Sequence, residues 1–269
     1  MGEHVRAGDL DIWTEQVGEG PDVLLIGGLA DTVESWQFQL DGLADRYRLI
    51  AFDNRGAGRT KLPERTLSVA TLADDAAAVL RALEVPFAHV AGFSMGSAIA
   101  QELALRHPEL VRSLVLVSTY ARPDALLRAQ LDFWRWLPEA APSEAAFFRA
   151  FLTWVYTPRA HADGTVEQIV EEALAFPHQQ SVEAFQAQVD ACREHDTVDR
   201  LSDIAVPTLA MAGEFDTILP PRFGRAVAER IPGARFEVLP GEAHQPFQEV
   251  PDEWNARVEA FWREVEARG

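Results

Sequence analysis

The chain contains little of what would mark it as a disulfide-bonded, membrane-spanning or secreted protein. Cys192 is the only cysteine among 269 residues, which excludes an intramolecular disulfide and a zinc cluster built from cysteines. No stretch approaches the ~20 consecutive apolar residues that a membrane-spanning helix needs. The charged first residues also lack the apolar segment of a secretory leader. We therefore expect a cytoplasmic protein with no membrane partner.

Positive charge is scarce as well. Lys61 is the only lysine, and 24 basic residues face 42 acidic ones, which gives a formal net charge of −18. Such a charge repels phosphate backbones and anionic lipid surfaces, so we expect no nucleic-acid partner. The acidic residues are scattered along the chain, as on a well-solvated surface. The sequence leaves open whether the protein is a monomer or a homodimer.

Strand and helix patterns alternate through most of the chain. Residues 9–18 alternate as a half-exposed strand does, and apolar runs typical of buried strands occupy 22–28, 47–53, 87–93, 111–119, 206–216 and 234–240. Helical spacing of apolar residues occupies 34–46, 69–83, 95–107, 221–231 and 252–267. This alternation predicts an α/β fold with a doubly wound, mostly parallel sheet.

One long segment breaks the alternation. Residues 121–201 contain no convincing strand; they hold helical segments separated by prolines, and they are rich in aromatic residues. The simplest organisation is one α/β core, residues 1–120 and 202–269, interrupted by a helical cap at 121–201.

A serine lies at a sharp bend in the core. "GFSMG" (92–96) matches G-x-S-x-G, directly follows an apolar strand and opens a helix. At such an elbow the serine adopts strained backbone geometry, and its hydroxyl is exposed at the carboxyl edge of the sheet, where open α/β folds bind ligands. The alternative is an ordinary helix N-cap serine in a glycine turn. The context favours Ser94 as a nucleophile.

A serine hydroxyl needs a histidine to take its proton and an acid to orient that histidine. In folds with this elbow the chain order is serine, acid, histidine. Asp216 follows a late strand in "GEFDTILP", and His244 follows the last strand in "PGEAHQPF", so both should reach the same sheet edge as Ser94. The nearby Glu214 and Glu242 are interpreted as surface charges.

The negative charge that develops on a tetrahedral intermediate needs backbone N–H donors. One donor should be the N–H of Met95, the residue after the nucleophile. The other should come from "GGLADT", the loop after the strand at 22–28, and we assign it to Leu29. A glycine pair after a strand is also a common turn signal, so the loop could have no further role.

Five motifs in this order resemble the α/β-hydrolase fold superfamily over essentially the whole chain, and they are "GGL…SW", "FDNRGAGRT", "GFSMGS", "GEFDTILP" and "PGEAHQPFQEVP". The resemblance is to bacterial esterase-like and enol-lactone-hydrolase-like members. It implies a helical cap inserted after the sixth strand, a triad of Ser94, Asp216 and His244, and no metal or organic cofactor. Gly27 stands where relatives commonly have histidine, and Ser97 where a second glycine often follows the elbow.

The expected activity is hydrolysis of an ester-type bond in a small, mostly apolar substrate through an acyl-enzyme. The residues expected to contact this small molecule are Gly28 and Phe93 of the core and Trp134, Trp136, Phe151 and Trp154 of the cap. The same triad could instead perform C–C bond hydrolysis, lactone opening, lyase chemistry or perhydrolysis. A ligand receptor with a vestigial triad is the alternative from another class.

Overall fold

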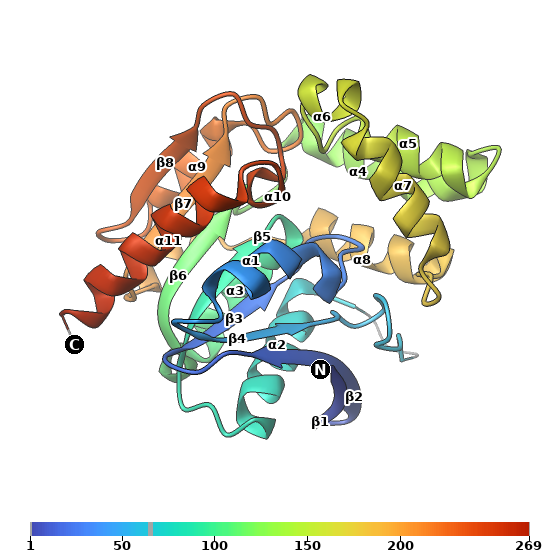
Figure 1. Cartoon of the computed structure of the whole chain (residues 1–269). Coiled ribbons are helices and arrows are strands. Elements are labelled where there is room, and N and C mark those ends of the chain that lie inside the picture. The colour runs from blue at the N-terminus through green and yellow to red at the C-terminus, as the bar shows by residue number, and fades with distance from the viewer. Residues whose placement is uncertain (1, 64–66, 269) are drawn as a thin grey trace.

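The computed structural model describes residues 2–63 and 67–268, and within them one sheet of eight strands runs through the molecule (Figure 1). Its strand order is β1-β2-β4-β3-β5-β6-β7-β8, antiparallel where β2 pairs with β1 and β4 and parallel elsewhere. The strands are β1 (Glu3–Ala7), β2 (Leu10–Val17), β3 (Asp22–Ile26), β4 (Arg48–Phe52), β5 (Ala88–Phe93), β6 (Val111–Val117), β7 (Thr208–Gly213) and β8 (Arg235–Leu239).

Helices cover both faces of this sheet. One face packs against α2 (Val69–Ala82), α3 (Met95–Arg106) and α9 (Pro221–Ala228). The other packs against α1 (Gln37–Leu43) and α11 (Pro251–Glu266), with the short α10 (Pro246–Glu249) beside them. Every residue of β5 and β7 is buried, which explains why these strands read as continuous apolar runs.

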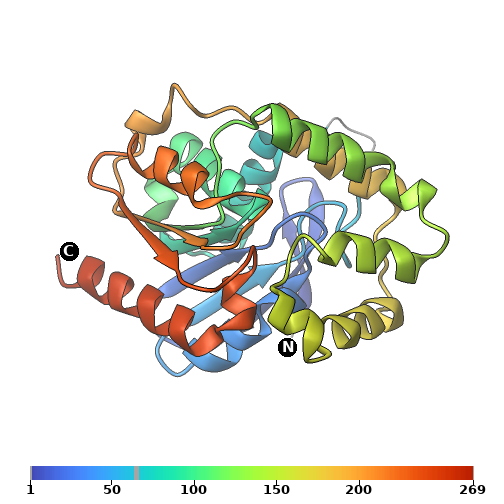
Figure 2. The same cartoon turned by 90° about the horizontal axis from the view of Figure 1, so that it is seen from above.

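A group of helices lies between β6 and β7, and the structure describes every residue of this segment. They are α4 (Ala125–Ala140), α5 (Glu144–Leu152), α6 (Pro158–Ala162), α7 (Thr165–Ala175) and α8 (Val182–Glu194). Figures 1 and 2 show them projecting to one side of the sheet. The helix starts follow from the sequence, because Asp124, Ser143, Thr157 and Ser181 each accept a backbone N–H of the first turn.

The predicted fold class is confirmed, and most predicted elements fall within a few residues of those in the structure. Two were not predicted, β1 and α10. β1 is an edge strand whose side chains are mostly exposed, so it carries little apolar pattern. Counting β1, the helical insertion follows the sixth strand, as the resemblance implied. Among the described residues, no helix is both long and apolar enough to cross a membrane.

Candidate active site

The backbone at Ser94 has the strained geometry expected of an elbow. Its φ is 53° and its ψ −115°, between the end of β5 and the start of α3. A Cβ on Gly92 would lie 2.2 Å from the carbonyl oxygen of Gly96, and one on Gly96 would lie 2.1 Å from that of Ile26. Both flanking positions therefore exclude any side chain. The Ser94 side chain makes no capping bond to α3, which removes the N-cap alternative.

The three side chains predicted to form a triad meet at this edge of the sheet. Ser94 Oγ lies 3.0 Å from His244 Nε2, and His244 Nδ1 lies 2.8 Å from Asp216 Oδ2. The other Asp216 oxygen, Oδ1, accepts the backbone N–H groups of Ile218 and Leu219 at 2.9 and 2.8 Å. These donors fix the carboxylate and leave Oδ2 to orient the imidazole ring.

The charge state of Asp216 follows from its surroundings. Burial by itself raises the pKa of this carboxyl. The His244 ring and the backbone donor at Leu219 outweigh burial, so the pKa of Asp216 lies below its ordinary value. The carboxylate is ionised at neutral pH, as is required of a group that stabilises an imidazolium.

The loop that carries His244 is held by the chain segment between α5 and α6. The His244 N–H donates to the Val155 carbonyl at 3.1 Å, and Ser118 Oγ donates to the His244 carbonyl at 2.8 Å. Glu242 is buried and pairs with Arg159 of α6 at 2.8 Å, so its interpretation as a surface charge was wrong. Glu214 is exposed, as predicted.

The loop assigned to the second oxyanion donor is pinned on both sides of Leu29. The Gly28 N–H donates to Asp31 Oδ2 at 2.8 Å, and the Ala30 N–H donates to Gln188 Oε1 at 3.0 Å. Ala30 has a φ of 65°, a value that residues with side chains rarely adopt. The N–H groups on either side of Leu29 are thus satisfied within the protein, and Leu29, Ser94 and Met95 border the same small hollow.

Three residues that shape the site were not identified from the sequence. Gln188 reaches Ala30 from α8 and is fully buried, but a glutamine on an amphipathic helix carries no distinguishing signal. Ser118 was taken only as the end of a strand. Asp31 follows the "GGLA" stretch directly, and that position could have drawn attention to it. Burial raises the pKa of Asp31 to about 6, although the Gly28 N–H and His244 act in the opposite direction.

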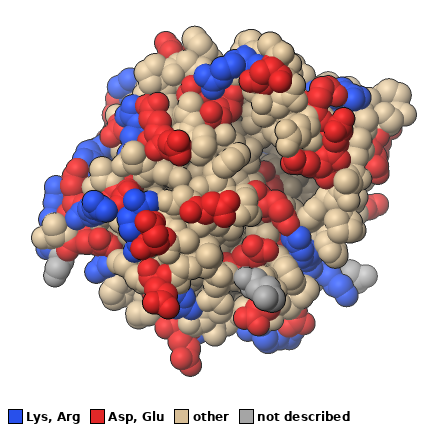
Figure 3. Space-filling view, in the orientation of Figure 1, with Lys and Arg blue, Asp and Glu red and all other residues tan. Residues whose placement is uncertain are grey.

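A cavity of about 1140 Å³ opens above Ser94 and His244, between the core and the helical insertion. Figure 3 shows the corresponding hollow, with acidic side chains along its rim. Of the expected contact residues, Phe93, Trp134 and Phe151 line the cavity. Trp136 and Trp154 are not among the described residues that line the cavity, and their side chains are 50% and 36% exposed. Gly28 lies behind the lining, where its lack of a side chain lets the Phe93 ring pack against the loop.

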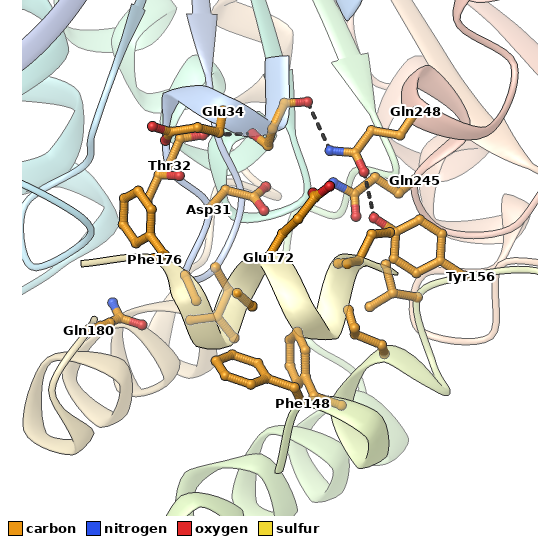
Figure 4. A pocket seen from close by; sticks show the side chains of 18 of the residues that line it. Asp31, Thr32, Glu34, Phe148, Tyr156, Glu172, Phe176, Gln180, Gln245 and Gln248 are labelled. Atoms are coloured by element: carbon orange, nitrogen blue, oxygen red, sulfur yellow. Dashed lines mark hydrogen bonds between the residues drawn. The ribbon is translucent and has the colours of Figure 1, made fainter. Parts of the chain in front are cut away.

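The cavity is less uniformly apolar than expected. Figure 4 shows Asp31 and Glu172 directed into it, with the rings of Phe148, Phe176 and Tyr156 around them. Seven carboxylate side chains line the cavity, whereas Arg159 is the one lysine or arginine among its described lining residues; the acidic ones are Asp31, Glu34, Asp41, Glu144, Asp163, Glu172 and Glu249. The part of the chain that the structure describes contains no group of three metal-ligating side chains.

A mostly parallel sheet with a serine elbow at its carboxyl edge and a histidine on the loop after its last strand defines a hydrolase of the α/β type. Residues 21–250 match the model of the family described as alpha/beta hydrolase fold, and the chain belongs to this family.

Its relatives span almost its full length. The protein named "Putative carbamate hydrolase RutD" of Azorhizobium caulinodans is 34% identical over 98% of this chain and 99% of its own. "Putative non-heme bromoperoxidase BpoC" of Mycobacterium tuberculosis is 31% identical over 93% of this chain and 97% of its own. The crystal structure of a hydrolase from Pseudomonas aeruginosa superimposes with a TM-score of 0.88 at 28% identity, covering 97% of this chain and 98% of that one.

Proposed function

We propose that the protein is a serine hydrolase that cleaves an ester-type bond through an acyl-enzyme. The observation that carries this proposal is the 3.0 Å contact between Ser94 Oγ, held in strained geometry, and His244 Nε2. A serine in such a contact loses its proton to the imidazole as it attacks a carbonyl carbon. The ionised Asp216, 2.8 Å from Nδ1, stabilises the imidazolium that forms.

The reaction proceeds in two steps. Ser94 Oγ bonds to the carbonyl carbon, and the carbonyl oxygen becomes an oxyanion that accepts the N–H groups of Leu29 and Met95. The His244 imidazolium gives its proton to the leaving oxygen, the C–O bond breaks, and the acyl group stays on Ser94. Water then gives a proton to His244 and attacks the acyl carbon. The bond from that carbon to Ser94 Oγ breaks, His244 returns the proton to Oγ, and the acid is released.

The proposed substrate is a small molecule that occupies the cavity beneath α4–α8. Many aromatic side chains line that cavity, Phe147, Phe148 and Phe151 among them, which supports the expectation of a largely apolar substrate. We include in the proposal a division of the chain into a core, residues 1–120 and 202–269, and a cap at 121–201 that selects the substrate. A variant lacking the cap that folds and keeps the same substrate range would contradict this division.

The name of one relative is compatible with this chemistry. A carbamate, as in the name of the Azorhizobium caulinodans relative, also presents a carbonyl carbon to a nucleophile. The same triad could act on a lactone or a C–C bond, and substrate profiling distinguishes these alternatives. A receptor with a vestigial triad would show no burst of product with an activated ester, whereas an acyl-enzyme mechanism gives one when deacylation is slow.

The test is the Ser94→Ala variant assayed with p-nitrophenyl esters. Removal of the nucleophile should reduce kcat by at least about 10³-fold, since only transition-state binding then remains. The matched control is Trp136→Ala, whose side chain is half exposed and outside the cavity lining, and it should keep wild-type turnover. Undiminished turnover by folded Ser94→Ala would refute the proposal.

A further inference from the structure

A second, much smaller hollow adjoins Ser94. Its volume is about 20 Å³, against about 1140 Å³ for the main cavity. Its walls are Leu29, Ser94, Met95, Tyr120, Leu127, Leu131, Trp134, Cys192, Ile218 and Leu219. Apart from Ser94, the side chains of these walls are apolar or already hydrogen-bonded, because the Tyr120 hydroxyl donates to the Cys192 carbonyl at 3.2 Å. We call this hollow the recess.

The two hollows differ in which parts of the site they touch. The recess is bounded by Ser94 and by both residues assigned to the oxyanion, Leu29 and Met95. His244 is absent from the described residues that line the recess, but it lines the main cavity. The proton donor to the leaving group is therefore on the main-cavity side of the nucleophile.

This arrangement orients the tetrahedral intermediate. Its carbon carries four groups: Ser94 Oγ, the oxyanion, the leaving oxygen and the remaining acyl substituent. The oxyanion must meet the Leu29 and Met95 N–H groups, and the leaving oxygen must meet His244 Nε2. The acyl substituent is then directed away from His244, and the space next to Ser94 on that side is the recess.

We propose that the recess is the acyl subsite and that it admits a substituent of about one heavy atom, so the preferred substrates are acetyl esters of large alcohols. This proposal rests on the proposed function. One ordered water needs about 10–15 Å³ of such space, so 20 Å³ has room for a methyl group and not for a chain. The alcohol, which leaves from the His244 side, has the whole main cavity.

The walls of the recess are fixed by the packing of the cap on the core. Leu127 and Leu131 of α4 are each 3% exposed and belong to the main hydrophobic cluster. Ile218 and Leu219 are buried and lie two and three residues after Asp216, whose carboxylate accepts their N–H groups. Because these side chains cannot swing into solvent, a longer acyl chain must displace packed atoms, and each added methylene should reduce kcat/KM about tenfold.

The experiment compares two ester series on the wild-type protein. In one the leaving group is p-nitrophenol and the acyl group grows from acetyl to butyryl and hexanoyl, with each rate divided by its spontaneous hydrolysis rate. In the other the acyl group is acetyl and the alcohol grows from phenol to naphthol. From acetate to hexanoate four methylenes are added, so we expect kcat/KM to fall about 10⁴-fold, and we expect it to change less than tenfold along the alcohol series. A hexanoate rate equal to the acetate rate would overturn the proposal.

Variants of α4 test whether the acyl group binds in the recess. Leu131→Ala should widen the recess and raise the hexanoate-to-acetate ratio at least tenfold, and Leu131→Val is the milder substitute should the alanine variant not fold. The matched control is Leu126→Ala on the same helix, because Leu126 is 61% exposed and should leave the ratio unchanged. An unchanged ratio in both Leu131 variants would assign the acyl group elsewhere.

The same assays separate the two proposals. If no ester in either series is hydrolysed, or if Ser94→Ala matches the wild type, the proposed function fails. If esters are hydrolysed in a manner that depends on Ser94 but without the acyl-length preference, only the assignment of the recess fails.

Discussion

Replacing Gln188 by methionine tests whether the cap helps to build the oxyanion site. Gln188 Oε1 accepts the Ala30 N–H and its Nε2 donates to the Arg55 carbonyl, both at 3.0 Å. Methionine has nearly the same length and shape but makes neither bond. The fully buried position then leaves a backbone donor and a backbone acceptor without partners.

The Gln188→Met substitution should lower both the stability of the protein and its kcat, and the structure indicates the size of each effect. Two buried backbone groups that lose their partners destabilise the fold by about 2–6 kcal/mol. For a chain of this size that corresponds to a fall in Tm of roughly 5–15 °C. Removing a whole oxyanion donor lowers kcat about 10²–10³-fold, so loosening the Leu29 loop through its neighbour Ala30 should lower kcat by about 10–100-fold. KM should change little, because Gln188 lies behind the loop rather than in the cavity lining.

The assay measures kcat and KM with p-nitrophenyl acetate well below the variant's Tm. Gln188→Glu retains an acceptor for Ala30 and should keep more of kcat than Gln188→Met. Gln186→Met, on the same helix but bonded only to the Arg135 carbonyl near the surface, is the control and should behave as wild type. A Gln188→Met protein with a lower Tm but an unchanged kcat would show that the residue supports the fold alone, and the reasoning would be refuted.

Three further predictions concern the scaffold of the site. Burial raises the pKa of Asp31 to about 6, above its unfolded value, so the folded state binds this proton more tightly and loses stability as the pH rises through 6. Asp31→Asn should therefore stabilise the protein by about 1.4 kcal/mol more at pH 8 than at pH 5, and equal changes in Tm at both pH values would contradict this. Arg55→Met removes the guanidinium that binds the buried Asp75 at 2.6 Å and should lower the free energy of unfolding by about 3–5 kcal/mol in urea titrations; a loss below 1 kcal/mol would count against a structural role. Gly92→Ala brings a Cβ within 2.2 Å of a backbone oxygen and should destabilise by at least about 3 kcal/mol, whereas a wild-type urea midpoint would show that the elbow is not tightly packed.

The sequence predicted those parts of the site that depend on local geometry and chain order. Glycines on both sides of a serine that follows a buried strand indicate that the backbone there leaves no room for side chains. The close backbone contacts of Gly92 and Gly96 agree with this. Parallel strands end at one edge of a sheet, so residues as distant as Asp216 and His244 could be expected beside Ser94. The His244 ring lies 2.8 Å from Asp216 and 3.0 Å from Ser94, as this reasoning requires.

The cap could not be predicted in the same way. Trp134 and Trp136 are two residues apart on α4, which places them about 200° apart around the helix. Trp134 is 3% exposed and Trp136 is 50% exposed, and only the packing of α4 decides which of the two is buried. Glu242 was misread for a related reason, since its partner Arg159 lies on a cap helix far away in the sequence. Gln188 on α8 likewise contacts a loop far away in the sequence, because it accepts the Ala30 N–H.

Ser97, a departure from the common pattern of the family, also has a structural explanation. Its hydroxyl is buried and donates to the Ser94 carbonyl at 2.6 Å. The side chain therefore braces the strained turn through the Ser94 carbonyl and makes no bond to the Ser94 hydroxyl.

Covalent labelling tests the central claim most directly. The full-length protein is treated with a fluorophosphonate, which phosphonylates an activated serine, and the adduct is located by peptide mass spectrometry. We predict a single adduct per chain, on Ser94, that is absent from Ser94→Ala and forms much more slowly in His244→Ala. Labelling at another residue, or an unlabelled Ser94 in a protein that hydrolyses esters, would contradict the assignment of Ser94 as the nucleophile.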